Sequence, residues 1–416
     1  MSQTNINARE RATYVGLESA FGVAPSSTFP NVMTRVFPLG DALILDGLAQ
    51  EMLPVLDERV RREDAIHPVH GLKIATKIGA LKCLLKATKT AAQLSASGTP
   101  GSLTPRILLT HAFGAEHALA GSTVATGTST TQFDVQAGLG VNFKPGTWLV
   151  VFRGSAEGEP AKIVSVSTDT LVVTPALGGI PSSTDVVRNL YNYAGAESHS
   201  NSLTVQQAFV GDSTAQVQAT GCHGSIAFDL PECGKLPSMS LPLAAANFTG
   251  PSSQSFNVAT ASDEMGASFA WAPSVYLAAS LDRAVTVPCE GVTLEHSNTW
   301  EMVRDPAATQ TVATVVNTAG RPTTCKATIK LRFDSSYVPA FTGDTAYHFV
   351  VVQKVGTGAT ASFWIWELPV AQLVAQPKLS KIGERLHMEL SFEGVQDTAI
   401  TGTDDFALAT FRVAFG

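Results

Sequence analysis

The chain has 416 residues, of which 44% are apolar and only 15% are charged, and its formal net charge is −7. This length accommodates two or three domains that each bury a core. The low charge indicates that partners cover much of the surface, because free monomers normally carry a charged exterior. The acidic balance excludes a protein that grips phosphates through clustered lysine and arginine, and no apolar run approaches the roughly 20 residues of a membrane helix.

Residues 1–40 are predicted to form an extended N-terminal arm without a signal peptide, because glycine, proline and isolated aromatic residues interrupt any helical period there. The mixed-charge run 57–64 follows. It fits either a solvated loop or a loop that reaches a neighbouring subunit, where mixed charges set the register of an interface. In the second interpretation, the inter-subunit or inter-ring contacts are made by Arg59, Arg61 and Arg62.

Strict alternation of apolar and polar residues predicts half-buried strands at 72–78 and, with lysines at the same places, at 325–331. Between them, segment 80–92 places Leu81, Leu84 and Leu85 on one face of a helical period and lysines on another. It therefore predicts an amphipathic helix packed on a sheet, with a helix on a membrane surface as the alternative.

Other segments also occur twice. The set 226–231, 235–236 and 248–250 parallels the set 364–369, 378–379 and 392–394. This repetition predicts a β domain duplicated within the chain, and chance similarity among β-rich segments is the alternative. The first domain would be discontinuous, over 41–120 and 186–256, and the second would span 257–416.

The first copy is interrupted by about 115 additional residues. Within them, 143–152 predicts a turn and a strand, and 161–167 with 169–174 predicts a hairpin. We expect a small inserted β domain over 121–185, bounded by linkers rich in glycine, serine and threonine.

In the second half, the change of phase at Glu290 and Gly291 predicts a bulge in a strand. The polar stretch 304–324 predicts a long hairpin arm. Alternating residues at 386–392 and 407–413 predict two closing strands. The expected fold class is therefore all-β.

Soft metal ligands are present but poorly placed. His67 lies three residues before His70, and Cys222 and His223 are followed by Cys233, so neither group completes the four ligands of a zinc site. The five scattered cysteines predict buried thiols in a reducing compartment. We expect no metal site.

Catalytic motifs do not occur in the sequence. It has no dinucleotide-binding or Walker-type loop and no nucleophile elbow, so we expect no catalytic residue, no cofactor and no enzymatic activity. Asp229, Glu232 and Glu367 stand beside prolines at predicted strand ends, where a structural role is expected.

Three aromatic residues, Phe363, Trp364 and Trp366, alternate with Ile365. This pattern predicts side chains that face two packed layers or a subunit interface, with a sugar-binding platform as the alternative.

Taken together, these segments resemble the major tail tube proteins of long-tailed bacteriophages. The resemblance lies in the opening segment 14–25, the region 73–94, the segment 221–226 and the segment 326–334 with its following turn. It covers most of the chain apart from the insertion.

The resemblance implies a structural virion protein with a β-sandwich domain and one helix, whose inner strands join those of neighbouring subunits into a continuous barrel. Its rings stack into a hollow tail tube that conducts genomic DNA to the host, after assembly in the host cytoplasm. Relatives build each ring from six tube domains, so the duplication favours three chains with pseudo-sixfold symmetry over six chains. The second copy departs from the pattern, because proline interrupts the place of its helix at 335–339.

The implied partners are further copies of this chain, a tape measure protein, and tail terminator and tail tip proteins, with no membrane. DNA would pass without adhering, so we expect a net acidic or neutral lumen. Uncompensated Lys73, Lys77, Lys326 and Lys330 in the lumen would contradict that expectation. The main alternative is a glycan-binding adhesin or receptor-binding β protein of a virion or cell surface. A hydrolase with perturbed acids in a deep pocket is a third reading.

Overall fold

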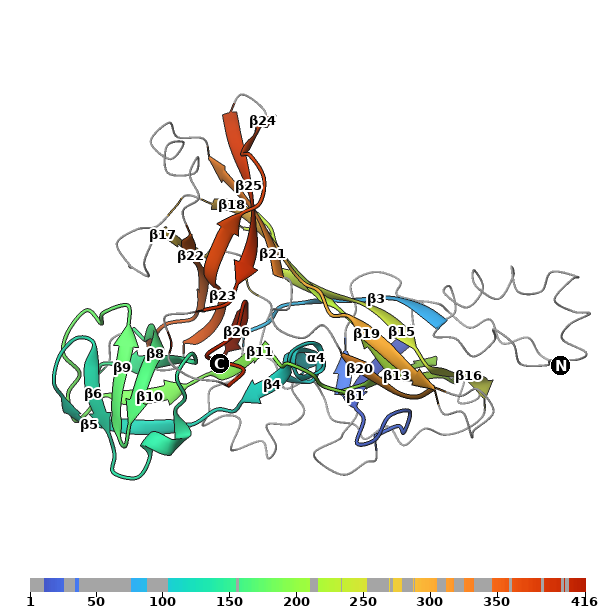
Figure 1. Ribbon diagram of the computed structural model, residues 1–416, viewed down its shortest axis with the longest axis horizontal. Helices are drawn as coiled ribbons and strands as arrows, with labels where there is room; N and C mark the ends of the chain where they lie inside the picture. The colour runs from blue at the N-terminus through green and yellow to red at the C-terminus, as the bar shows by residue number, and fades with distance from the viewer. Residues whose placement is uncertain are drawn as a thin grey trace, which may run out of the picture.

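The computed structural model consists mostly of antiparallel β-strands, and one α-helix occurs among its described residues (Figure 1). This confirms the all-β prediction. The structure describes residues 11–25, 34–36, 76–87, 104–154, 157–209, 216–232, 234–252, 269, 272–278, 287, 289–304, 312–317, 325–332, 346–358, 361–382, 385–397, 400 and 404–416.

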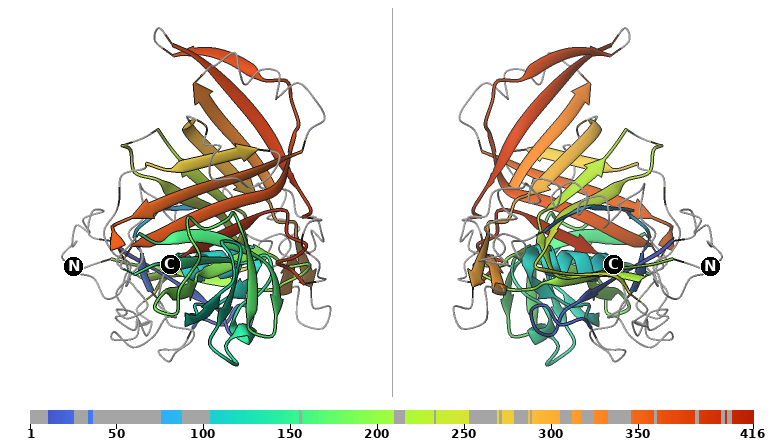
Figure 2. Two further views of the ribbon diagram at one scale, coloured as in Figure 1. Left: turned by 90° about the vertical axis from the view of Figure 1, so that its left-hand side faces the viewer. Right: turned by 90° about the vertical axis from the view of Figure 1, so that its right-hand side faces the viewer.

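The largest element is an 18-stranded sheet that bends across the molecule. In Figure 2 its orange and red strands run side by side above the helix and the green barrel strands. The sheet consists of β1 (Arg11–Leu17), β2 (Thr34–Val36), β3 (Thr76–Leu84), β4 (Gly114–His117), β11 (Tyr191–Gly195), β12 (Leu203–Phe209), β13 (Gln216–Gly224), β14 (Ile226–Leu230), β15 (Ser238–Ala245), β16 (Asn247–Ser252), β17 (Ser274–Ala278), β18 (Cys289–His296), β21 (Cys325–Arg332), β22 (Tyr347–Val355), β23 (Ser362–Leu373), β24 (Lys378–Ile382), β25 (Arg385–Val395) and β26 (Arg412–Phe415).

Six further strands close into a small barrel in the order β10-β5-β6-β9-β8-β7. They are β5 (Gly121–Gly127), β6 (Gln132–Val135), β7 (Trp148–Phe152), β8 (Glu159–Ser167), β9 (Thr170–Thr174) and β10 (Val186–Asn189), with a 3-10 turn η2 (Gly140–Asn142). The hairpin predicted over 161–174 is confirmed as β8 and β9. The chain enters and leaves the barrel side by side, because Asn189 N donates to Ala120 O at 2.7 Å.

Strand β7 is buried on both faces, which explains its continuous apolar sequence. Leu149 and Val151 point into the barrel core. Trp148, Val150 and Phe152 point outward and pack on the barrel-facing side of β22 and β23. The barrel therefore covers one face of these strands of the large sheet.

The helix lies at a different place from the predicted one. Segment 80–84 belongs to β3, so the prediction of a helix there is wrong. Leu81, Cys83 and Leu85 are buried while Lys82 and Lys86 are more exposed, a period of two that pairing with β15 imposes. The observed helix, α4 (Thr104–Phe113), has Pro105 in its first turn, where no backbone N–H is needed, and packs against β1, β4 and β11.

The segments proposed as duplicates are strands, but their neighbours differ. β14, from the first set, lies between β15 and β18, whereas β23, from the second set, pairs with β22, β25 and β26. The predicted N-terminal arm is extended over Arg11–Leu17, yet β1 pairs along its whole length with β12 in the large sheet.

The predicted bulge is confirmed, since the register between β18 and β21 shifts between Cys289 and Gly291. The predicted strand 407–413 is largely wrong, because Asp404 accepts a hydrogen bond from Ala407 N and holds a turn before β26 begins. The predicted hairpin arm also starts earlier, at β19 (Trp300–Arg304), which pairs with β20 (Val312–Asn317).

Candidate interaction surface and buried polar clusters

One face of the large sheet is exposed and carries alternating charges. The opposite face of strands β14, β18, β21 and β25 supplies core residues such as Phe228, Leu294, Ile329 and Leu390. Because side chains alternate along a strand, the polar residues between them share the outer face. Apolar-in, polar-out alternation is typical of an antiparallel sheet with one solvated side.

The charges on this face form ladders across neighbouring strands. In one row, Lys326 of β21 stands opposite both Glu295 of β18 and Glu393 of β25. In the next charged row, Glu389 of β25 stands opposite Lys330 of β21 and Lys378 of β24. Opposite charges in directly paired positions stabilise the register of a sheet.

The ladder charges cancel. Together with the ion pair between Lys82 and Asp229, at 3.9 Å, the two rows bring four cationic and four anionic side chains onto the face: Lys82, Lys326, Lys330, Lys378, Asp229, Glu295, Glu389 and Glu393. Lys326 and Lys330 thus each stand opposite a glutamate. The sequence analysis also named Lys73 and Lys77 as lysines that could line the lumen, but Lys73 and the side chain of Lys77 lie outside the described residues.

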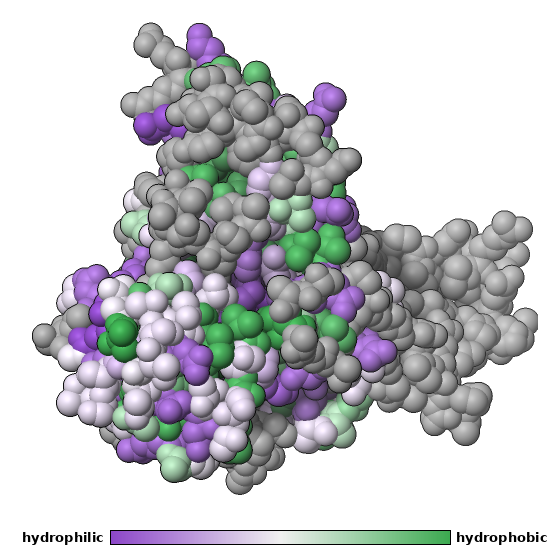
Figure 3. Space-filling view, turned by 60° about the vertical axis from the view of Figure 1, so that its left-hand side comes forward, coloured by the Kyte–Doolittle hydropathy of each residue, from purple (hydrophilic) through white to green (hydrophobic). Residues whose placement is uncertain are grey.

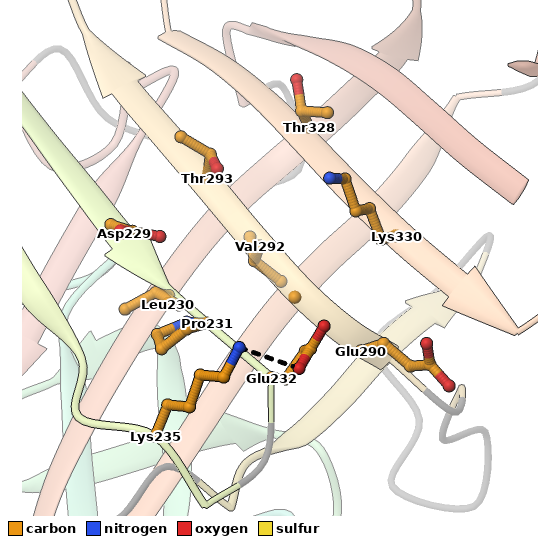
Figure 4. A pocket seen from close by; sticks show the side chains of 11 residues that line it. Asp229, Leu230, Pro231, Glu232, Lys235, Glu290, Val292, Thr293, Thr328 and Lys330 are labelled. Carbon is orange, nitrogen blue, oxygen red and sulfur yellow. Dashed lines mark ion pairs between the residues drawn. The ribbon is translucent and has the colours of Figure 1, made fainter. Parts of the chain in front are cut away.

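A shallow pocket of about 200 Å³ opens on the same face, where β14, β18 and β21 meet (Figure 4). Its lining combines Asp229, Glu232 and Glu290 with Lys235 and Lys330. Lys235 is paired with Glu232 at 3.0 Å. The pocket is therefore a depression in the ladder face whose lining has one carboxylate more than it has lysines. The carboxylates Asp229 and Glu232 flank the end of β14 at Pro231, as predicted.

The predicted contact residues fall into two groups. Arg59, Arg61 and Arg62 lie outside the described residues. Phe363, Trp364 and Trp366 are at most 1% exposed, so they have no surface to offer another subunit or a sugar in this conformation. Trp364 and Trp366 belong to the main core, whereas Phe363 packs with the barrel-facing layer. This is the arrangement of two packed layers that the alternation predicts.

A buried ionic network joins the barrel to the large sheet. Glu367 of β23 accepts hydrogen bonds from Lys162 Nζ at 2.7 Å, Trp148 Nε1 at 2.8 Å and His348 Nε2 at 2.8 Å. Arg412 of β26 lies 3.3 Å from the same carboxylate. Lys162 and Trp148 belong to the barrel, so the network crosses the junction between it and the sheet.

A second carboxylate balances the network. Asp397 contacts Arg412 at 3.0 Å and Lys162 at 3.6 Å, and all four charged residues are at most 3% exposed. Burial alone would raise the pKa of Glu367, but Lys162, Arg412 and the hydrogen bond from His348 hold that pKa well below its usual range. We call Lys162, Glu367, Asp397 and Arg412 the junction network.

Glu367 does not stand at a strand end, contrary to the sequence prediction. β23 continues to Leu373, and Pro369 occupies a shift of register between β22 and β23, where a strand tolerates a residue without an N–H.

In Figure 3 the barrel presents a mixed polar surface, and apolar residues gather where it meets the body of the chain.

A second cluster of polar side chains gathers three imidazoles around an indole. Trp300, the first residue of β19, stacks on His111 of α4 at 5.4 Å and 7°. It also contacts His199 edge-on at 5.2 Å and His223 of β13 at 5.7 Å. We call the three imidazoles the histidine cage.

Burial keeps the cage neutral. It lowers the pKa of His111 to about 3 and that of His199 to about 4, and it also lowers the pKa of His223. His111 Nδ1 lies 2.7 Å from Asn201 O and so carries the proton, which leaves Nε2 buried without a hydrogen-bond partner. Nearby His296, stacked on Phe113 at 4.4 Å, has its pKa lowered to about 3 by burial.

Sequence reasoning missed both clusters. Glu367 and His223 were each singled out in the sequence, but the other members of the two clusters are far apart in the chain, and no local pattern brings them together. One weak signal exists for the cage: Gly114, with φ +80°, follows α4 directly, and a Cβ there would lie 2.4 Å from the His199 ring. A glycine after a helix is, however, a common C-terminal cap and does not by itself indicate a histidine.

Within the described part of the chain, no group of three or more His, Cys, Asp or Glu side chains is arranged to hold a metal ion. The helical residues described there include no segment long and apolar enough to cross a membrane. No protein-family model matches the chain, and no curated protein matches its sequence.

Proposed function

We propose that this chain is a structural virion protein, a subunit of a hollow tube of the kind built by the major tail tube proteins of long-tailed bacteriophages. The observation that carries the proposal is the exposed, charge-balanced ladder face of the large sheet. DNA moving past a wall needs a surface that does not hold phosphates, and paired lysines and glutamates whose charges cancel meet that need.

The β24–β25 hairpin supports self-assembly. Among the described strands β24 is paired with β25, and no other described strand occupies its second edge. Leu379 stands opposite the buried Met388, and Leu386 lies two residues away on the same face, yet they are 58% and 42% exposed. Apolar side chains beside an open edge are typical of a surface that another subunit covers.

In this proposal copies of the chain form rings that stack into the tube. The trimer with pseudo-sixfold symmetry is favoured by the repeated segments and the hexamer is the alternative. The inserted barrel decorates the tube, and tape measure, terminator and tail tip proteins are the further partners. The tube conducts DNA in the virion tail. The glycan-binding alternative loses its main support, because the aromatic cluster on which it relied is buried.

Electron microscopy of the purified protein at high concentration tests the proposal. We expect hollow rings or tubes whose two-dimensional averages have threefold or sixfold symmetry. A monomer that never assembles, even when seeded with tail tip complexes, would contradict the proposal.

A matched pair of variants identifies the contact surface. Leu379→Asp places a charge on the hairpin, and Val141→Asp places one on the barrel, where Val141 is 84% exposed. We expect the hairpin variant to remain unassembled and the barrel variant to assemble as the original chain does. Equal assembly of both variants would remove the hairpin from the proposed interface.

A further inference from the structure

The junction network holds an amine against a carboxyl group inside the protein. Lys162 of β8 and Glu367 of β23 are both buried, and their Nζ and Oε1 atoms lie 2.7 Å apart. A primary amine and a carboxyl group in such contact can condense to an amide, with water as the second product. The contact crosses from the barrel to the large sheet, so the amide would be a covalent link between them.

Burial favours the amide over the ion pair. Each buried charge loses the stabilisation that water would give it, whereas an amide is neutral. Groups that a fold holds in reactive geometry also behave as if present at about 10⁵–10⁸ M, which offsets the cost of forming an amide in water. The remaining charges of the network still cancel, because Arg412 Nη2 lies 3.0 Å from Asp397 Oδ2.

The two oxygens of Glu367 have different surroundings. Oε2 accepts a hydrogen bond from Trp148 Nε1 at 2.8 Å and lies 3.3 Å from Arg412, and both neighbours stabilise negative charge that develops there during attack. Oε1, beside the amine, also accepts from His348 Nε2 at 2.8 Å, and the His348 side chain is 12% exposed. Oε1 is therefore the oxygen that can be protonated and leave.

Asp397 is placed to accept a proton from the amine. Its Oδ2 lies 3.6 Å from Lys162 Nζ, and both side chains are buried. A small movement of the lysine brings the proton within reach, and a positioned base of this kind contributes about 10²–10⁴-fold to a rate.

We propose that Lys162 and Glu367 form an isopeptide bond, which fastens the barrel to the large sheet. One proton passes from Nζ to Oε1 along their hydrogen bond and leaves a neutral amine, which attacks Cδ. Asp397 accepts the second proton from Nζ. His348 then protonates Oε1, which departs as water.

The atoms balance without a co-reactant. One N–C bond forms and one C–O bond breaks, and the third proton of Lys162 stays on the amide nitrogen. The proton that Asp397 returns to solvent equals the one that His348 regains from solvent. This inference does not depend on the proposed function, because the bond would form in a free subunit as well as in an assembly.

The reaction is slow compared with folding. Burial alone would raise the pKa of Glu367, but Lys162 and Arg412 hold that pKa well below its usual range. The neutral carboxyl group that the amine attacks is therefore a minor species. A newly folded chain carries the ion pair and acquires the bond as it ages.

Mass spectrometry of the full chain tests the bond. We expect a species lighter than the sequence by the mass of one water molecule, in a fraction that grows during incubation at neutral pH. Trypsin does not cut after an acylated lysine, so this species should yield a branched peptide that contains both Lys162 and Glu367. Tandem sequencing of that peptide locates the branch.

An exposed ion pair serves as the internal control. Lys354 contacts Glu157 in the same way, but Glu157 is 69% exposed, so water solvates both charges and their peptides should stay separate. Lys162→Arg keeps a cation at the junction without a primary amine, and this variant should retain the full mass of its sequence. Lys354→Arg should lose water as the original chain does. If Lys162→Arg does not fold, the branched peptide of the original chain decides alone.

Two results would overturn the proposal. One is an original chain that keeps the full mass of its sequence throughout the incubation. The other is loss of water without a branch between Lys162 and Glu367, as would follow from cyclisation of an aspartate elsewhere or from a branch to Asp397.

Discussion

The junction network and the histidine cage both bury polar side chains, but they do so in opposite ways. At the junction, two cations and two anions cancel, and hydrogen bonds join Glu367 to Lys162 and Asp397 to Arg412. In the cage, three imidazoles avoid charge altogether and contact an indole. The first cluster is stable while its groups remain ionised, and the second is stable while its groups remain neutral.

The two clusters therefore lose their contribution to stability in different pH ranges. The cage histidines have lowered pKa values in the folded chain, so their contribution is complete above about pH 6.5 and is lost as the pH falls towards 4 and 3. The pKa of Glu367 is also lowered, but from a carboxylate value, so its contribution is complete above about pH 4.3 and is lost only below that. Mild acid therefore affects the cage first.

The largest expected effect comes from breaking the junction network. Glu367→Gln keeps the shape of the side chain but leaves Lys162 and Arg412 with Asp397 as their only carboxylate among the network residues. An uncompensated buried charge costs roughly 3–5 kcal/mol. We expect a loss of that size in the free energy of unfolding at pH 7.5, measured by urea titration.

Glu393→Gln is the matched control for that substitution, because it makes the same chemical change in the exposed ladder. A loss at Glu367 no larger than the loss at Glu393 would mean that the junction charges do not depend on each other.

The next largest expected effect is on the stability that the chain loses when the pH falls. His296 is enclosed between Phe113 and Phe411, and burial outweighs the effect of a backbone hydrogen bond at Ala112 on its pKa. Between pH 7.5 and pH 5, a histidine with a pKa near 3 in the folded chain loses about 2 kcal/mol of stabilisation, because the unfolded chain takes up a proton and the folded chain does not. His296→Phe should reduce the acid-induced loss of stability by that amount.

Urea titrations at the two pH values measure this difference. Val141→Ala, on the barrel surface, should leave the change between pH 7.5 and pH 5 unaltered, because it neither adds nor removes a titrating group. If His296→Phe has the same acid response as the original chain, the histidine is not neutral in the folded state.

The smallest effect is expected in the ladder. Lys326 stands opposite two glutamates on a solvated face, and exposed cross-strand ion pairs contribute about 0.2–1 kcal/mol. Lys326→Gln should therefore cost less than about 1 kcal/mol, and this cost should fall further at 1 M salt. A cost that salt leaves unchanged would indicate packing of the lysine stem in place of an ion pair.

Local patterns predicted the strands well and the clusters not at all. The alternation at 325–331 and the bulge at Gly291 follow from neighbouring residues, and both are present. The helix was misplaced because Leu81 and Leu85 satisfy a helical period as well as a strand period, and pairing with β15 decides between them. The contact between Lys162 and Glu367 joins residues 205 positions apart, so only the assembled fold brings it about.

The hydrogen bond between Asn189 N and Ala120 O, at 2.7 Å, places both ends of the barrel segment next to each other. A segment whose ends meet can be lengthened, removed or exchanged with little effect on the path of the chain outside it. The segment between Ala120 and Asn189 is therefore suited to replacement by a foreign domain whose termini lie next to each other. Such a graft would remove Lys162 and Trp148 from Glu367 and would uncover the apolar face of β22 and β23, so a replacement domain would have to supply both.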